Sequence, residues 1–192
     1  MLNLDKNKKY LLACSFGPDS MALFDMLRKQ GYDFSAALVN YHLRKESSDE
    51  MNNFVSYCNE NKISYFVKEI NAKELKGNVE ENCRLIRYRW FKELCDQNHF
   101  DAVLVAQHQD DSIETFLLQK RRKNNVFCYG IGEQTKLFGA LVIRPLLNFK
   151  KTDLEKYCKE NQVPFSIDSS NLSEKYQRNK IRHSVIKGLS ER

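Results

Sequence analysis

A repeated alternation of short apolar runs with helical patterns limits how this chain can fold more than any other feature. The apolar run of residues 10–14 is followed by a turn of small residues and then by apolar side chains at helical spacing over 20–30. The same unit recurs, with further strands expected over 34–39, 63–67 and 102–106 and helices over 48–61, 79–95 and 110–122. Strands that alternate with helices predict an α/β fold with a doubly wound, mostly parallel sheet and flanking helices.

The alternation becomes irregular beyond residue 123. A last short strand is expected over 141–143, and helical patterns follow over 150–161 and 176–189. We therefore expect an α/β domain over residues 1–147 and a basic helical extension over 148–192.

Charge is distributed unevenly along the 192 residues. Residues 1–117 carry 15 Lys/Arg against 18 Asp/Glu, whereas residues 118–192 carry 16 against 7. Such an excess of positive charge indicates a surface that meets a polyanion, and nucleic acid is the commonest one inside cells. A solvated basic face without a partner is the alternative.

Composition excludes several classes of protein. No run of 18 apolar residues could span a bilayer and no secretory signal precedes the first strand, so we expect a cytoplasmic protein with no membrane partner. The six cysteines occur singly, without a C-x-x-C pair or histidines at metal-ligand spacing, and are expected to be reduced core residues. A homodimer is compatible with the sequence.

The loop after the first strand, Ser15–Ser20, is the first candidate site. In open α/β sheets ligands bind at the carboxyl ends of the strands. Backbone N–H groups of such a turn and of the following helix attract anions, and two serine hydroxyls add donors, so a phosphate chain is the expected ligand. The alternative is a simple turn in which Asp19 or Ser20 caps the helix.

A second loop follows the strand over 102–106 and places acidic side chains at a helix start. Asp110, Asp111 and Glu114 would repel one another unless a cation compensates, and Mg²⁺ held jointly with nucleotide phosphates fits. His108 beside them favours function over a solvated acidic helix start.

Two further groups are weaker signals on their own. His42 follows the second strand, where a hydrogen-bonded surface histidine is the alternative. Arg84, Arg87 and Tyr88 share one face of the long helix and could hold phosphates and stack on a base. Ion pairs with glutamates of the same helix are the alternative for the arginines.

Taken together, these segments resemble the tRNA(Ile)-lysidine synthetases of the PP-loop ATP pyrophosphatase superfamily. The loop after the first strand resembles the PP-loop, whose usual form is S-G-G-x-D-S. The matching segments, in the order and approximate spacing of the family, are Ser15–Ser20, Tyr41–Arg44, Asn82–Tyr88, His108–Thr115, Arg144–Leu147 and Asp168–Asn171.

The resemblance implies a fold like that of the adenine nucleotide alpha hydrolases and a two-step reaction. ATP with Mg²⁺ would adenylate the wobble cytidine of a CAU-anticodon tRNA(Ile), and free lysine would then displace AMP. The resemblance implies catalytic roles for Arg84, His108, Asp110 and Asp111, the last two also as Mg²⁺ or lysine-amine ligands. It implies ATP contacts from Ser15, Phe16, Gly17, Pro18, Asp19, Ser20 and His42, and tRNA contacts from Arg144, Arg178, Asn179 and Arg182.

Phe16 departs from the family pattern, because it stands where the PP-loop has a glycine. If that position requires positive φ or close approach of a phosphate, ATP binding would suffer. Two rival functions follow from other features. A tRNA thiolase shares the adenylation chemistry but usually needs paired cysteines, and a non-catalytic RNA- or nucleotide-binding module would not obviously need the acidic cluster.

Overall fold

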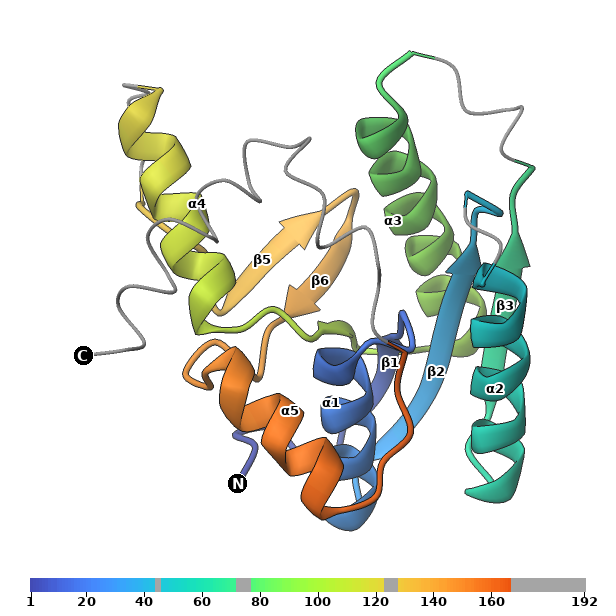
Figure 1. Ribbon diagram of the computed structural model, residues 1–192. Coiled ribbons are helices and arrows are strands. Elements are labelled where there is room, and N and C mark those ends of the chain that lie inside the picture. The colour runs from blue at the N-terminus through green and yellow to red at the C-terminus, as the bar shows by residue number, and fades with distance from the viewer. Residues whose placement is uncertain (44–45, 72–76, 123–127, 167–192) are drawn as a thin grey trace.

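The computed structural model describes residues 1–43, 46–71, 77–122 and 128–166 (Figure 1). Strands and helices alternate from the first strand to the fourth helix, and a hairpin and one more helix follow. The elements are β1 (Lys9–Ala13), α1 (Pro18–Lys29), β2 (Asp33–Asn40), α2 (Ser47–Glu60), β3 (Tyr65–Glu69), α3 (Val79–Asn98), β4 (Ala102–Val105), α4 (Gln109–Arg121), β5 (Gln134–Leu137), β6 (Ala140–Ile143) and α5 (Lys151–Glu160).

The strands form one six-stranded sheet in the order β3-β2-β1-β4-β6-β5. All neighbouring pairs are parallel except β5 and β6, which form an antiparallel hairpin at one edge. β1 is central, and Leu12 pairs with Ala36 of β2 on one side and Leu104 of β4 on the other. The chain therefore winds in both directions from β1, which confirms the predicted doubly wound, mostly parallel sheet.

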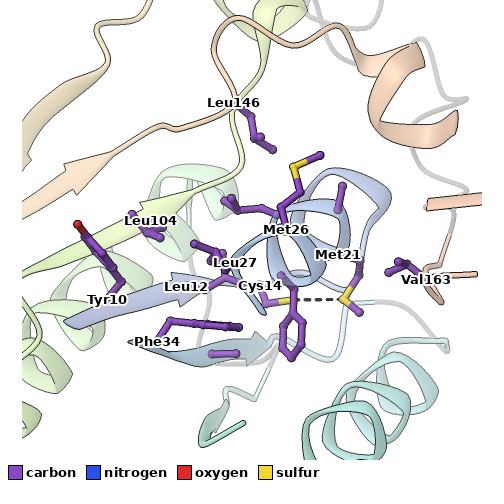
Figure 2. Close-up of a cluster of buried hydrophobic side chains, with 14 of the residues drawn as sticks. Tyr10, Leu12, Cys14, Met21, Met26, Leu27, Phe34, Leu104, Leu146 and Val163 are labelled. Carbon is purple, nitrogen blue, oxygen red and sulfur yellow. Dashed lines mark hydrogen bonds between the residues drawn. The ribbon is translucent and has the colours of Figure 1, made fainter. Parts of the chain in front are cut away.

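Apolar side chains from the two faces of the sheet form two separate cores. Leu12 and Leu104 point to the face covered by α1, α2 and α5, where Figure 2 shows them with Met21, Leu27 and Val163. The neighbouring residues of β1 and β4 point to the opposite face and pack against Phe91 of α3. Because a parallel strand is buried on both faces, its sequence is an uninterrupted apolar run, which explains why the sequence pattern located these strands.

The helix α5 packs against α1 and shares its core (Figure 1). Tyr157 donates its hydroxyl to a carboxylate oxygen of Asp25 over 2.8 Å, and the Cys158 thiol lies 3.3 Å from the carbonyl oxygen of Pro18. After α5 the chain returns to the β1–α1 loop, where the Ser166 amide donates to the carbonyl oxygen of Phe16 over 2.9 Å. Residues 151–166 thus complete the layer that covers the loop after β1.

Three features differ from the expected elements or lie outside what the structure describes. The third strand begins at Tyr65 rather than at residue 63, and β5 was not expected at all. β5 is a polar edge strand whose residues alternate between exposed and half-buried, so it lacks the apolar run that reveals a buried strand. The final helix expected over 176–189 lies outside the described residues, and the division into 1–147 and 148–192 stays a prediction.

Most of the cysteines lie in the core, as the sequence predicted. All six cysteines are free, and all but Cys128 are buried. Burial raises the pKa of the Cys58 and Cys158 thiols to about 12, so these groups are protonated packing residues at neutral pH. Among the described residues, no helix is both long and apolar enough to cross a membrane.

The contact between α5 and α1 predicts the effect of removing one hydroxyl. Asp25 is buried and accepts hydrogen bonds from Arg28, Lys29 and Tyr157. Burial disfavours its charge, but these three donors together lower its pKa below the usual range. We expect Tyr157→Phe to lower the free energy of unfolding by about 1.5–3 kcal/mol, measured by urea denaturation, because a charged buried acceptor loses a donor.

Lys156→Gln on the same helix is the matched control. Lys156 forms an exposed ion pair with Glu160, and such pairs contribute about 0.5 kcal/mol or less. Equal losses in the two variants would contradict the role assigned to the Tyr157 hydroxyl.

Candidate functional site

A cleft of about 830 Å³ opens where β1, β2 and β4 end. The loops after these three strands form its floor, and α2 and α3 supply its walls. The residues that line it include Ser15, Asp19, Ser20, Asn40, Tyr41, Glu50, Arg87, Tyr88, Phe91 and Gln107. A polar floor at the carboxyl ends of parallel strands, next to the strand at which the winding reverses, is the usual ligand site of this architecture.

The Ser15–Ser20 loop leads into the N-terminus of α1 and leaves the backbone N–H groups of that helix end uncapped by side chains. The N-cap residue of α1 is Gly17, and no side chain caps the helix, so Asp19 and Ser20 do not act as N-caps. Ser20 instead donates its hydroxyl to the Gly17 carbonyl over 3.0 Å and accepts from the Ser15 amide over 3.3 Å. The hydroxyl therefore shapes the loop, and the positive end of the α1 dipole remains available to an anion.

Phe16 adopts the left-handed backbone conformation that glycine favours, with φ of +58°. Its ring is only 2% exposed and belongs to the core between the sheet, α1 and α5. The Ser166 amide fixes its carbonyl oxygen on the far side of the loop. The position does require positive φ, and phenylalanine meets that requirement by turning its ring into the core and away from the cleft.

His108, the N-cap residue of α4, joins the two predicted loops. Its Nε2 atom lies 3.6 Å from Asp19 Oδ2 and 3.5 Å from Asp111 Oδ2. The ring is 1% exposed. Burial by itself would lower the pKa of His108, but the carboxylates of Asp19, Asp111 and Asp110 outweigh it and raise that pKa above the ordinary value. His108 therefore lies between carboxylates of two loops that are about 90 residues apart in sequence.

Two buried polar atoms in this cluster have no hydrogen-bond partner within the part of the chain that the structure describes. They are Nδ1 of His108 and Oδ1 of Asp19. Buried polar groups are nearly always satisfied, so such a pair indicates a place where a bound molecule or ion supplies the partner.

The carboxylates fit a shared rather than a complete cation site. Asp111 accepts a hydrogen bond from the His108 amide over 3.1 Å, and both Asp110 and Asp111 are half-buried in the first turn of α4. In the described ranges no group of three or more His, Cys, Asp or Glu side chains could hold a metal ion unaided. Mg²⁺ typically binds through one or two carboxylates together with nucleotide phosphates and waters, and this donor set matches that mode.

Other predicted site residues lie apart from the His108 cluster. His42 pairs with Glu69 over 2.8 Å at the rim of the cleft. Arg84 is exposed on α3. Arg144 is 7% exposed and donates to Gln107 and to the Gly132 carbonyl. The ATP, phosphate and tRNA roles of these three stay predictions, and Arg178, Asn179 and Arg182 lie outside the described residues.

Two buried polar residues of the cleft, Asn40 and Glu50, were given no role by the sequence interpretation, although Asn40 opens the loop that contains His42. Asn40 is 3% exposed at the end of β2, where its side-chain oxygen Oδ1 accepts from the His42 amide over 2.9 Å. Its place at a strand end could have marked it. Glu50 is a buried acid of α2 that lines the cleft, and nothing in the acidic, polar pattern around it distinguishes it from its exposed neighbours.

Comparison with known proteins identifies relatives of nearly the whole chain. The family described as the PP-loop domain matches residues 1–189. A tRNA(Ile)-lysidine synthase of Ureaplasma parvum is 34% identical over 190 residues, and one of Mesoplasma florum is 36% identical over 185 residues. These alignments cover 96% and 95% of this chain but 56% and 46% of the relatives, so the chain spans about half of their length. The family resemblance is thereby confirmed.

Solved structures share the fold at low sequence identity. A U34-tRNA thiolase from Methanococcus maripaludis superposes with a TM-score of 0.81 at 17% identity, covering 98% of this chain and 68% of the thiolase. An NH3-dependent NAD synthetase from Campylobacter jejuni gives a TM-score of 0.57 at 15% identity, covering 96% of this chain and 76% of the synthetase. At these identities the likeness extends to the fold alone.

The conformation of Phe16 predicts an unusual order of stabilities. Phe16→Ala removes a buried ring and keeps the left-handed strain, whereas Phe16→Gly removes both. We expect both variants to be destabilised, Phe16→Ala by about 3–5 kcal/mol and Phe16→Gly by about 1 kcal/mol less. Urea denaturation measures the difference. A glycine variant less stable than the alanine variant, as in ordinary backbone conformations, would contradict a strained Phe16.

The raised pKa of His108 predicts a pH dependence of stability. A group whose pKa is higher in the folded than in the unfolded chain stabilises the fold below its unfolded pKa, about 6.5 for histidine, and loses that contribution as pH rises through the folded pKa. We therefore expect the stability of the protein relative to His108→Gln to be greatest near pH 5.5 and to decline towards pH 8.5. A difference that is constant or grows with pH would contradict the assigned direction.

Proposed function

Because this chain belongs to the family of PP-loop domains, we propose that it is the catalytic part of an ATP-dependent ligase that attaches lysine to the wobble cytidine of a CAU-anticodon tRNA(Ile). The observation that carries the proposal is the convergence of Asp19, His108 and Asp111 beside the uncapped start of α1. The relatives named tRNA(Ile)-lysidine synthase, which align with nearly all of the chain, support the choice of substrate.

The proposed reaction proceeds in two steps. The 2-carbonyl oxygen of the cytidine attacks the α-phosphorus of ATP, a P–O bond forms, and pyrophosphate leaves. The side-chain amine of lysine then attacks C2 of the adenylated cytidine, a C–N bond forms, and AMP leaves with the oxygen while the amine loses a proton. Both steps need an anion cradle and fixed charges around a phosphoryl group, which is what the cleft provides.

Each residue of the cluster receives a role in this proposal. Ser15, Gly17 and Ser20 form the anion cradle at the start of α1, in which backbone N–H groups and the Ser15 hydroxyl hold the phosphates of ATP while the Ser20 hydroxyl fixes the loop. His108 holds the carboxylates of Asp19 and Asp111 in position through its Nε2 atom. Asp110 and Asp111 would hold Mg²⁺, which would offset the charge of the phosphates when bound. The lysine amine is the alternative partner of these two carboxylates.

The transfer RNA would meet the basic half of the chain. We assign contacts with it to Arg144, Arg178, Asn179 and Arg182, which belong to the positively charged residues 118–192. Arg84 is assigned to phosphate and base contacts at the catalytic site. A cytidine of an anticodon loop can leave its stack at low cost, so a cleft open to solvent suffices to receive it. Such an enzyme would act in the cytoplasm.

The thiolase alternative has less support than lysine transfer. Five of the six cysteines are buried, and burial raises the pKa of Cys95 to about 11, with Cys58 and Cys158 higher still. Thiols of this kind are poor nucleophiles and do not carry persulfide chemistry readily. The likeness to a U34-tRNA thiolase extends to the fold alone.

The proposed activity is tested by supplying all its substrates. The purified chain is incubated with ATP, Mg²⁺, labelled lysine and unmodified tRNA bearing a CAU anticodon, and the nucleosides are then separated. Label in a modified cytidine that depends on ATP supports the proposal. Cleavage of ATP without transfer of lysine would indicate another acceptor, and RNA binding without ATP cleavage would indicate a non-catalytic binding module.

Asp111→Asn tests the carboxylate cluster within the same assay. We expect lysine transfer to fall by about 100-fold or more, because a fixed charge beside the phosphoryl group is lost. Asp153→Asn is the matched control, since both aspartates lie in the first turn of a helix, Asp153 exposed on α5 and Asp111 half-buried on α4. Equal activity of the two variants would contradict the proposed role of Asp111 in lysine transfer.

A further inference from the structure

The turn between β5 and β6 presents an aromatic side chain to solvent in a strained conformation. The turn consists of Phe138 and Gly139, both with positive φ, of +50° and +87°. Asparagine followed by glycine suits such two-residue turns, whereas a bulky side chain at positive φ is unfavourable. Phe138 is also 49% exposed, so burial offsets the strain only in part.

Phe138 stacks on Tyr88 of α3, which lies beside the hairpin (Figure 1). The ring centroids are 6.2 Å apart and the planes differ by 27°. The guanidinium carbons of Arg84 and Arg87 lie 5.8 Å and 5.9 Å from the centroid of the Tyr88 ring. Two aromatic rings and two guanidinium groups thus form one continuous surface, called here the aromatic platform.

Tyr88 itself cannot offer a free face to a base, although its position on α3 suggested that role. Its side chain is 8% exposed, because Phe138 covers it on one side and Phe91 packs against it edge-on. Phe138 is the member of the platform with an exposed ring. Aromatic rings flanked by cationic groups are the surfaces on which single-stranded nucleic acids stack their bases.

The platform adjoins the cleft, because Tyr88 and Arg87 belong to both. The turn lies close to α3, since a Cβ at Gly139 would be 3.0 Å from Cε of Lys92. The exposed ring of Phe138 thus lies against a residue that lines the cleft, at the side where α3 forms its wall.

We propose that Phe138 is a stacking residue for an unpaired RNA base adjacent to the nucleotide that enters the cleft. This inference rests on the proposed function, because it takes RNA as the substrate. It adds a contact that the basic residues do not supply, since a phenyl ring gains nothing from phosphates and recognises the flat face of a base. The hairpin then serves to place that ring, which accounts for phenylalanine at a position that favours asparagine.

The test compares substitutions at Phe138 for binding of unmodified CAU-anticodon tRNA in which the anticodon adenine is replaced by fluorescent 2-aminopurine. Phe138→Asn suits the turn and removes the ring, so we expect thermal stability equal to or above that of the unaltered protein and affinity lowered about 5- to 150-fold, the loss of one stacked base. Phe138→Trp keeps a ring and is expected to bind within about twofold. Quenching of 2-aminopurine should be lost in Phe138→Asn alone.

Phe116→Ala is the matched control, because Phe116 is an exposed aromatic on α4 that also pairs with a second ring, Tyr129. Its RNA affinity should not change. If Phe138→Asn binds as tightly as the unaltered protein while lysine transfer proceeds, the stacking role of Phe138 is wrong and the proposed function stands. If the unaltered protein binds no RNA, both fall. A loss of affinity in Phe116→Ala as large as in Phe138→Asn would also contradict a specific stacking role for Phe138.

Discussion

The pairing of β1 with β4 is the constraint on which the candidate site depends. These strands are separated by about 90 residues, yet they are hydrogen-bonded neighbours in the sheet, with Leu12 opposite Leu104. Their loops therefore emerge side by side, and Asp19 reaches His108 across 3.6 Å. Charged groups lose solvation when they are buried and need partners there. The sheet supplies such partners by bringing two loops together, so that His108 of one loop lies against Asp19 of the other. Its apolar packing thus determines which ionisable groups meet beside the cleft.

Buried parallel strands made much of this arrangement predictable from sequence. Their continuous apolar runs located β1, β2 and β4, and the polar residues just after each run located the loops that face the cleft. The strand order was not visible, because it depends on which apolar faces pack together. β5 escaped because a polar edge strand has no apolar signature. The pattern also could not show that Arg144 is buried against Gln107, since a basic residue in a loop usually reaches solvent.

Two phenylalanines share the left-handed backbone conformation and differ in surroundings. Phe16 has a fully packed ring, and its strain is offset by the apolar surface that it buries. Phe138 leaves half of its ring in water, and no comparable burial offsets its strain. Strained residues that the core does not stabilise are concentrated at functional sites. Phe16 therefore has a packing role in the first loop. Phe138 is better explained by contact with another molecule.

The hydrogen bond from Ser166 to Phe16 joins a loop that is synthesised early to a segment that is synthesised late. The β1–α1 loop leaves the ribosome early, but the residues that close over its far side follow about 150 positions later in the chain. At translation rates of about 5–20 residues per second, this interval is roughly 8–30 s. During that time the loop lacks both α5 and its amide partner. The contacts that α5 and Ser166 make with the β1–α1 loop therefore form only after nearly all of the described chain has been synthesised.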